Sequence, residues 1–162
     1  MQVKTIAALC ATLIGTAAHA AGPLTERNMS LDLANRIAAA GVAACAANGY
    51  AVAVAVVDRA GGIRAVQRAD NAGPHSLASA ERKAFTSASA KNTTLAMMEA
   101  SQKNPGAANL GDIPGFLLLG GGVPVKAGNE VVGAVGIGGA PGGHLDEQCA
   151  MTALDKVKDD LK

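Results

Sequence analysis

The stretch "EVVGAVGIGGAPGGHLDEQCA", from Glu130 to Ala150, joins two different hydrophobic patterns. Its first part, up to Gly139, is a run of β-branched and small residues with a single charge at its start, which is typical of a strand buried on both faces. After a glycine and proline break the spacing becomes helical from Gly143 onward, with Cys149 on the apolar face. The stretch therefore predicts a buried strand that leads directly into a helix.

The glycines of this stretch do not form a nucleotide-binding motif. A dinucleotide fingerprint that starts at Gly136 needs glycine at position 141, where the chain has Pro141. The sequence also contains neither a phosphate loop nor the G-x-S-x-G motif of serine hydrolases. We expect most of these glycines to be structural, because they let a strand lie close to a helix or allow a tight turn. Only Gly142 and Gly143, at a helix N-terminus, keep the arrangement of an anion cradle.

The rest of the chain shows the same alternation of strand and helix patterns. Helices are predicted over 24–50, 75–92 and 93–104 and from 143 onward. Thr25 or Ser30 could cap the first of them. Strands are predicted over 50–58, 63–70, 116–121, 123–128 and 130–139. Consecutive hairpins imply a mostly antiparallel sheet of five strands, and the few charges on these strands imply helices on both faces. We therefore predict an α/β (α+β) fold, a three-layer α/β/α sandwich.

The first twenty residues have the pattern of a signal peptide. Lys4 precedes a short apolar run, and Ala18, His19 and Ala20 fit a cleavage site of small residues. The apolar run is too short for a membrane span. We expect residues 1–20 to be removed, residues 21–162 to form a single domain, and the protein to be periplasmic or secreted.

Composition excludes one class of partner and leaves the state of the cysteines open. Without Lys4 the chain has 13 basic and 13 acidic side chains, and no basic stripe suggests nucleic acid. Aromatic residues make up only 2% of the chain, so we expect a core of Ala, Val, Leu and Ile. Cys45 and Cys149 remain after processing. In an oxidising compartment they could form a disulfide, or they could be two small buried thiols.

His144 and Glu147 are candidate metal ligands. Their spacing of three places them on one face of the predicted helix, where an imidazole and a carboxylate can hold a metal ion. The alternative for Glu147 is a favourable interaction with the helix dipole, and this interpretation is the better one for Asp146. Two ligands alone do not make a metal site.

A second histidine, His75, follows a glycine and proline at another predicted helix start. Arg82 and Lys83 lie about two turns further along that helix, with Glu81 beside them. These charges fit either a solvated helix face or a positive rim for a ligand that carries carboxylates. Both histidines of the processed chain lie at helix starts beside Gly/Pro loops, which favours a binding site over coincidence.

No catalytic constellation is present in the sequence. It shows no Ser-His-Asp order, no Cys-His pair with an orienting partner and no tight cluster of carboxylates. Arg64 and Arg68, on the same face of the predicted second strand, could form surface ion pairs or line a pocket. The residues themselves indicate an exported domain that binds a small molecule at two loop-to-helix corners, and they favour binding over enzymatic activity.

Four segments together resemble a known family. They are "VAVVDRAGG", "RADNAGPHSLASAERKAFTSAS", "IPGFLLLGGGVPV" and "EVVGAVGIGGAPGGHLDEQCA", in this order. The pattern resembles the GlcG/HbpS family of haem-binding proteins and is similar to the C-terminal domain of PduO-type cobalamin adenosyltransferases. The resemblance extends from about Leu24 to the end of the chain. It implies a profilin-like sandwich, which agrees with the predicted order of elements.

The resemblance implies an exported haem-binding protein that serves haem or iron handling or redox sensing. It implies His75 as the first candidate for an axial haem ligand and His144 as the second, with Arg82 or Lys83 pairing with the propionates. Glu147 is implied as a ligand for iron. The family also implies a homo-oligomer, with a shallow site near a subunit interface, and a sensor protein as a partner. The alternative is an enzyme or accessory protein of a carboxylate or diol pathway, with His144 as a general base.

Overall fold

The computed structural model describes residues 22–162, so the predicted signal peptide lies outside the described residues. The helices are α1 (Leu31–Ala46), α2 (Ser76–Ala90), α3 (Thr94–Lys103) and α4 (Gly143–Lys156), with short 3-10 helices η1 (Pro105–Asp112) and η2 (Lys158–Leu161). The strands are β1 (Ala53–Asp58), β2 (Ile63–Arg68), β3 (Gly122–Ala127) and β4 (Glu130–Gly138). No helix among these residues is long and apolar enough to cross a membrane.

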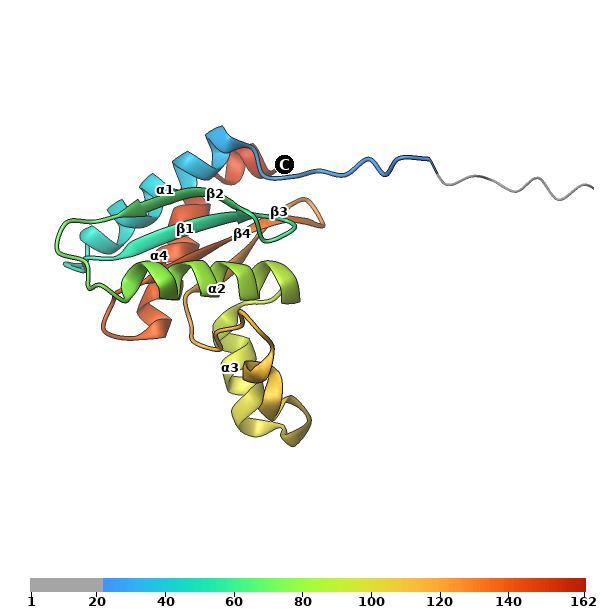
Figure 1. The fold of residues 1–162 in the computed structure, drawn as a ribbon. Coiled ribbons are helices and arrows are strands. Elements are labelled where there is room, and N and C mark those ends of the chain that lie inside the picture. The colour runs from blue at the N-terminus through green and yellow to red at the C-terminus, as the bar shows by residue number, and fades with distance from the viewer. Residues whose placement is uncertain (1–21) are drawn as a thin grey trace, which may run out of the picture.

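The four strands form one antiparallel sheet in the order β2-β1-β4-β3. Helices α1 and α4 pack on each other and on one face of the sheet, and α2 packs on the other face (Figure 1). The predicted three-layer α/β/α arrangement is therefore confirmed. Of the two caps that the sequence allowed for the first helix, the structure has Ser30, whose side chain accepts from the amide of Leu33, so α1 begins at Leu31 and not near position 24.

The sheet has four strands, so the prediction of five was wrong. The apolar segment 116–121 does not join the sheet as a strand, and its backbone bends at residues 119 and 120. Side chains hold much of its backbone: the amide of Leu117 donates to Thr86 Oγ1 at 2.8 Å, and Thr94 Oγ1 donates to the carbonyl of Leu119 at 2.7 Å. The end of the segment reaches the sheet, where the carbonyl of Gly121 accepts from the amide of Ile137 in β4 at 2.9 Å. At Leu117 and Leu119, hydroxyl groups of α2 and α3 thus take the place of a neighbouring strand as hydrogen-bond partners.

The layer between the sheet and α1 and α4 contains the larger core. It is built mainly from branched aliphatic side chains, with Ile37, Val54, Val135 and Ile137 fully enclosed. A disulfide joins Cys45 of α1 to Cys149 of α4, with their Cα atoms 5.3 Å apart. Of the two alternatives that the sequence allowed, the structure has the disulfide.

The layer between the sheet and α2 is built from the smallest side chains. Ala80 and Ala84 of α2 pack on alanines of β1 and β4. The helix lies so close that a Cβ added to Gly136 would be 2.0 Å from the carbonyl oxygen of Ala80, and one at Gly138 would be 2.1 Å from Ser79 Oγ. The glycines of β4 are therefore structural, as the sequence predicted, because any larger residue there would push α2 off the sheet.

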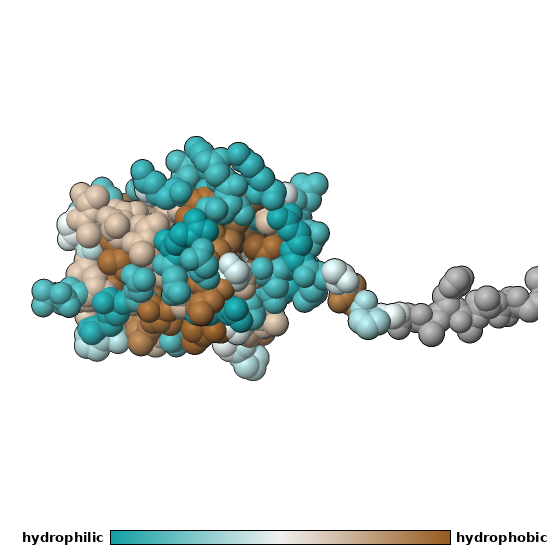
Figure 2. Space-filling view, turned by 90° about the horizontal axis from the view of Figure 1, so that it is seen from above, coloured by the Kyte–Doolittle hydropathy of each residue, from teal (hydrophilic) through white to brown (hydrophobic). Residues whose placement is uncertain are grey.

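Helix α3 and η1 form an arm that projects from the sandwich (Figure 1). The two elements pack mainly on each other, and only Thr94 and Met97 of α3 are buried, whereas η1 has no buried residue. The surface seen from above shows hydrophobic side chains exposed between hydrophilic ones (Figure 2). The body of the molecule therefore does not cover all of its apolar surface.

Candidate functional site

His75 lies at the start of α2 with its side chain exposed. It occupies the N-cap position, but its imidazole makes no capping hydrogen bond. The ring lies against Gly73, since a Cβ added to that glycine would be 2.7 Å from His75 Cε1. The glycine therefore provides the space in which the imidazole rests, and the ring remains open to solvent.

His144 has the same local arrangement at the start of α4. It is exposed in the first turn of the helix, and a Cβ added to Gly142 would be 2.8 Å from His144 Cε1. Each histidine thus lies over the glycine two residues before it. The repetition comes from the local sequence G-x-H at a helix start, which agrees with the sequence prediction of two similar corners.

The structure brings the two helix starts to the same end of the sheet. Gly138 ends β4 directly against the first turn of α2, next to Ser79, and α4 begins five residues later at Gly143. Because α2 and α4 cover opposite faces of the sheet, the histidines approach this end from different layers. We therefore treat His75 and His144 as separate candidates rather than as one pair of ligands.

Arg82 shares the outer face of α2 with His75. The two residues are seven positions apart, which is almost two turns and about 10 Å along the helix. Between them on this face lies exposed Ala78, which adds no bulk above the helix surface. Arg82 donates to the carbonyl of Phe116 and lines an open, mostly apolar depression of about 250 Å³. An exposed cation therefore lies beside apolar surface, two turns from an exposed imidazole.

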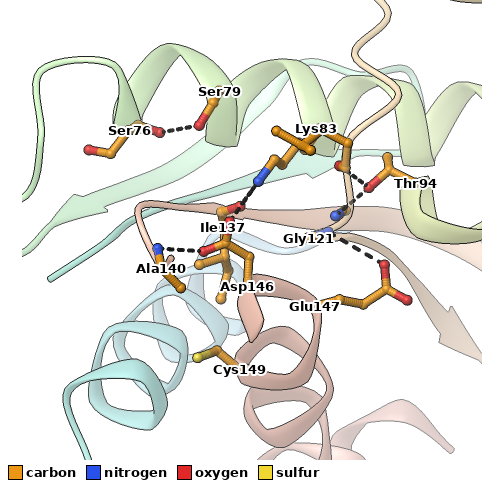
Figure 3. Close-up of polar contacts among 12 residues, drawn as sticks. Ser76, Ser79, Lys83, Thr94, Gly121, Ile137, Ala140, Asp146, Glu147 and Cys149 are labelled. Carbon is orange, nitrogen blue, oxygen red and sulfur yellow. Dashed lines mark hydrogen bonds and ion pairs between the residues drawn. The ribbon is translucent and has the colours of Figure 1, made fainter. Parts of the chain in front are cut away.

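Lys83, which the sequence placed on a positive rim, is inside the protein. Its side chain is 1% exposed, and Nζ donates to Asp146 Oδ2 at 2.7 Å and to the carbonyl of Ile137 at 2.9 Å (Figure 3). The helix turns this residue toward the sheet, between Ala80 and Ala84. In this structure the ammonium joins α2 to α4 and does not face a surface ligand.

Asp146 is the other half of this connection. The helix-dipole interpretation from the sequence accounts for its place in the first turn of α4, but the structure adds specific partners. Its Oδ1 accepts from the amide of Ala140 at 3.0 Å, while Oδ2 accepts from Lys83. Burial raises the pKa of the Asp146 carboxyl above its ordinary value, and the ammonium of Lys83 acts in the opposite direction.

Glu147 is held by backbone amides. Its Oε2 accepts from the amide of Leu95 at 3.2 Å. The same oxygen accepts from the amide of Gly121 at 3.4 Å (Figure 3). The carboxylate thus ties α4 to the first turn of α3 and to the end of segment 116–121. Among residues 22–162 there is no group of three or more His, Cys, Asp or Glu side chains that could hold a metal ion. The iron site at His144 and Glu147 stays a prediction.

Sequence reasoning missed the link between Lys83 and Asp146. The two residues are 63 positions apart, and each has an ordinary local explanation on its own helix. One signal could have found Lys83: it lies on the alanine face of α2, which packs on the sheet, and not on the exposed face with Arg82. A charge on the buried face of a helix needs a partner.

The geometry can be compared with known proteins. A model of the family described as "Haem degrading protein HbpS-like" matches residues 29–155. Protein GlcG of Escherichia coli K12 is 33% identical over 113 residues, which are 70% of this chain and 83% of GlcG.

The chain belongs to the HbpS-like family.

Solved structures agree with this assignment. The crystal structure of a double mutant of HbpS from Streptomyces reticuli is 38% identical and has a TM-score of 0.79, covering 90% of this chain and 98% of that one. The structure of a PduOC:haem complex has a TM-score of 0.70 at 23% identity, covering 79% of this chain and 94% of that one. The latter likeness shows the shared fold alone. The resemblance to the GlcG/HbpS family is thereby confirmed.

Proposed function

We propose that this HbpS-like protein is an exported haem-binding protein with its haem site on the outer face of α2. The observation that carries the proposal is the pair His75 and Arg82, both exposed on one face and about 10 Å apart along the helix. His75 ligates the iron, and Arg82 pairs with a propionate carboxylate. Bound haem supplies an iron that can change its oxidation state and take a further ligand.

The residues on this face fit a flat, partly apolar ligand. The surface between His75 and Arg82 is flat, because the small side chain of Ala78 lies between them. The depression beside Arg82 is lined by Phe85 and Ile63. The site is open and not a deep cavity, which agrees with the scarcity of aromatic residues. Lys83 is excluded from the propionate role in this proposal, because its ammonium is already bonded to Asp146.

Two features support an extracytoplasmic location and an assembly of several subunits. The disulfide between Cys45 and Cys149 is the kind of bond that persists in oxidising compartments. The projecting arm of α3 and η1 buries little against its own sandwich, so a homo-oligomer would give it a partner surface. Iron handling, redox sensing and a sensor-protein partner belong to the same proposal, and the resemblance to the family is what suggests them.

The proposal is tested by adding ferric haem to the purified protein and to two matched variants. We expect a shifted Soret band for the protein and a change of this band for His75→Ala. After reduction of the bound haem to the ferrous state, His75→Ala should also lose the iron–imidazole stretch in the resonance Raman spectrum. His144→Ala is the control, since its histidine has the same local setting and exposure; its spectra should match those of the parent protein.

Each result decides a separate part of the proposal. Arg82→Gln should keep the spectrum of the parent and weaken haem binding about threefold, as expected for one exposed ion pair. Identical spectra for His75→Ala and the parent would refute His75 as ligand while leaving haem binding intact. Absence of any Soret shift in the parent would refute the haem-binding function itself.

A further inference from the structure

Strand β2 is an open edge of the sheet. Among the described residues its only strand partner is β1, and helix α1 covers one of its faces. Helix α2 packs on β1, β3 and β4, so the other face of β2 is left largely open. The opposite edge, β3, is protected, because Pro124 has no amide hydrogen and Lys126 is a charge on the edge. The two edges of this sheet are therefore not equivalent.

The open face of β2 presents apolar side chains. Ile63 pairs with Val57 and Val66 pairs with Ala55, and these two β1 residues belong to the alanine layer under α2. Since cross-strand partners share a face, Ile63 and Val66 point to the same side as α2, where they are 56% and 39% exposed. The 250 Å³ depression between β2 and α2 has Ile63 and Phe85 in its walls. It is large enough for one aliphatic side chain.

The charges on β2 are all positive. Arg64 and Arg68 are exposed, and no acidic residue lies on the strand. The guanidinium of Arg68 donates to the carbonyl of Ala72, which keeps it near the end of the edge. Acidic Asp70 lies beyond the strand on the following loop, and Glu81 of α2 lines the depression together with Arg82. If the β2 strands of two copies paired in antiparallel fashion, the arginines of both copies would lie close together and repel one another. The charge pattern therefore disfavours a second copy of this chain as the partner.

We propose that the β2 edge binds an extended acidic segment of another protein by strand addition. The partner backbone pairs with residues 65–68, because Arg64 is the extra residue of a bulge opposite Val56 and Val57. An aliphatic side chain of the segment enters the depression beside Ile63, and its carboxylates pair with the two arginines. Backbone hydrogen bonds supply the affinity, and the depression and the charges select the sequence. The same depression borders the proposed haem face, so strand addition is proposed for the haem-free protein and does not depend on haem binding.

The test uses a blocked hexapeptide of alternating glutamate and valine as the probe. Titration calorimetry at low salt should show binding, and amide hydrogen exchange should slow at residues 65–68. The same peptide with alternate amides N-methylated cannot pair with the strand and should not bind, and a lysine and valine peptide should bind more weakly. The double variant Arg64→Glu/Arg68→Glu should bind the glutamate peptide about tenfold more weakly, as the loss of two exposed ion pairs predicts.

A matched control separates the two edges of the sheet. Lys126→Glu changes the same kind of charge on the β3 edge and should leave binding unchanged. His75→Ala should also bind the peptide normally, so a failed haem assignment does not affect this result. Equal binding of the N-methylated peptide, slowed exchange on β3, or self-association of the protein through β2 would each overturn the proposal. So would the absence of any binding to the glutamate peptide.

Discussion

The ion pair between Lys83 and Asp146 gives the sharpest test of how the layers are joined. Both side chains are almost fully buried, at 1% and 4% exposure, and Nζ and Oδ2 are 2.7 Å apart. Lys83→Met keeps most of the aliphatic volume but removes the donor to the Asp146 carboxylate and to the carbonyl of Ile137. Removal of one partner of a buried pair typically costs about 3–5 kcal/mol. We expect a loss in the free energy of unfolding of this size.

The assay is urea unfolding followed by circular dichroism, arranged as a double-mutant cycle. Lys83→Met/Asp146→Leu removes both charges and should recover most of the loss, because no uncompensated charge stays buried. Arg36→Met is the control, since Arg36 forms only exposed ion pairs with Asp32 and Asp160. Its cost should stay below about 1 kcal/mol. A cost for Lys83→Met no larger than this, or a double variant whose loss equals the sum of the two single losses, would refute the reasoning.

The pH dependence of the same variant has a definite sign. Burial already holds the pKa of Asp146 above its ordinary value, and loss of Lys83 removes an opposing influence. Between the ordinary carboxyl pKa and the raised one, the folded state binds a proton that the unfolded state has released, so stability falls as the pH rises through this window. The cost of Lys83→Met should therefore be smaller at about pH 5 than at about pH 7.5. An equal cost at both values would contradict the account of Asp146.

Three further outcomes are expected. Gly136→Ala should lower the free energy of unfolding by about 3 kcal/mol or more, seen as a strong drop of the thermal midpoint, because the new Cβ would lie 2.0 Å from a helix carbonyl oxygen. Gly111→Ala is the control, since its nearest contact would be at 4.0 Å, and it should change the free energy of unfolding by less than about 0.5 kcal/mol. Replacing Cys45 and Cys149 by alanine should lower the free energy of unfolding by about 4–5 kcal/mol, because their disulfide closes a loop with a sequence separation of 104. Detection of two titratable thiols in the unreduced parent protein would contradict the disulfide. Glu147→Ala should speed hydrogen exchange at the amides of the α3 start and of segment 116–121 about tenfold, while Glu147→Gln, which keeps an acceptor oxygen, should not.

Much of this fold follows from short-range patterns in the sequence. The near-continuous apolar runs of β1 and β4 predict strands covered on both faces, and the structure confirms helices on both sides of the sheet. The glycines at 136 and 138 predict close contact of strand and helix, which the approach of α2 explains. The motifs also identify the family. These features depend on residue size and spacing along a few turns of chain, which the sequence contains directly.

Segment 116–121 shows where local patterns fail. Its apolar run has the composition of a strand, yet its backbone bonds mainly to side chains, namely the hydroxyls of Thr86 and Thr94 and the carboxylate of Glu147. It meets a strand at Gly121, whose carbonyl accepts from the amide of Ile137. Those side chains come from three different helices. Whether an extended segment pairs with a strand or with side chains depends on what the fold places beside it, and a local window does not contain this information.

The sequence by itself determined the family, the layered architecture, the order of the four helices and of the four strands that form the sheet, and the two histidines at helix starts. Only the tertiary structure decided that Lys83 is buried against Asp146, that Cys45 joins Cys149, that Glu147 is occupied by amides and that β2 is left open. The physical reason is the same in each case. The role of a charge, a thiol or a strand edge depends on whether a partner or solvent lies next to it, and that neighbour comes from a distant part of the chain.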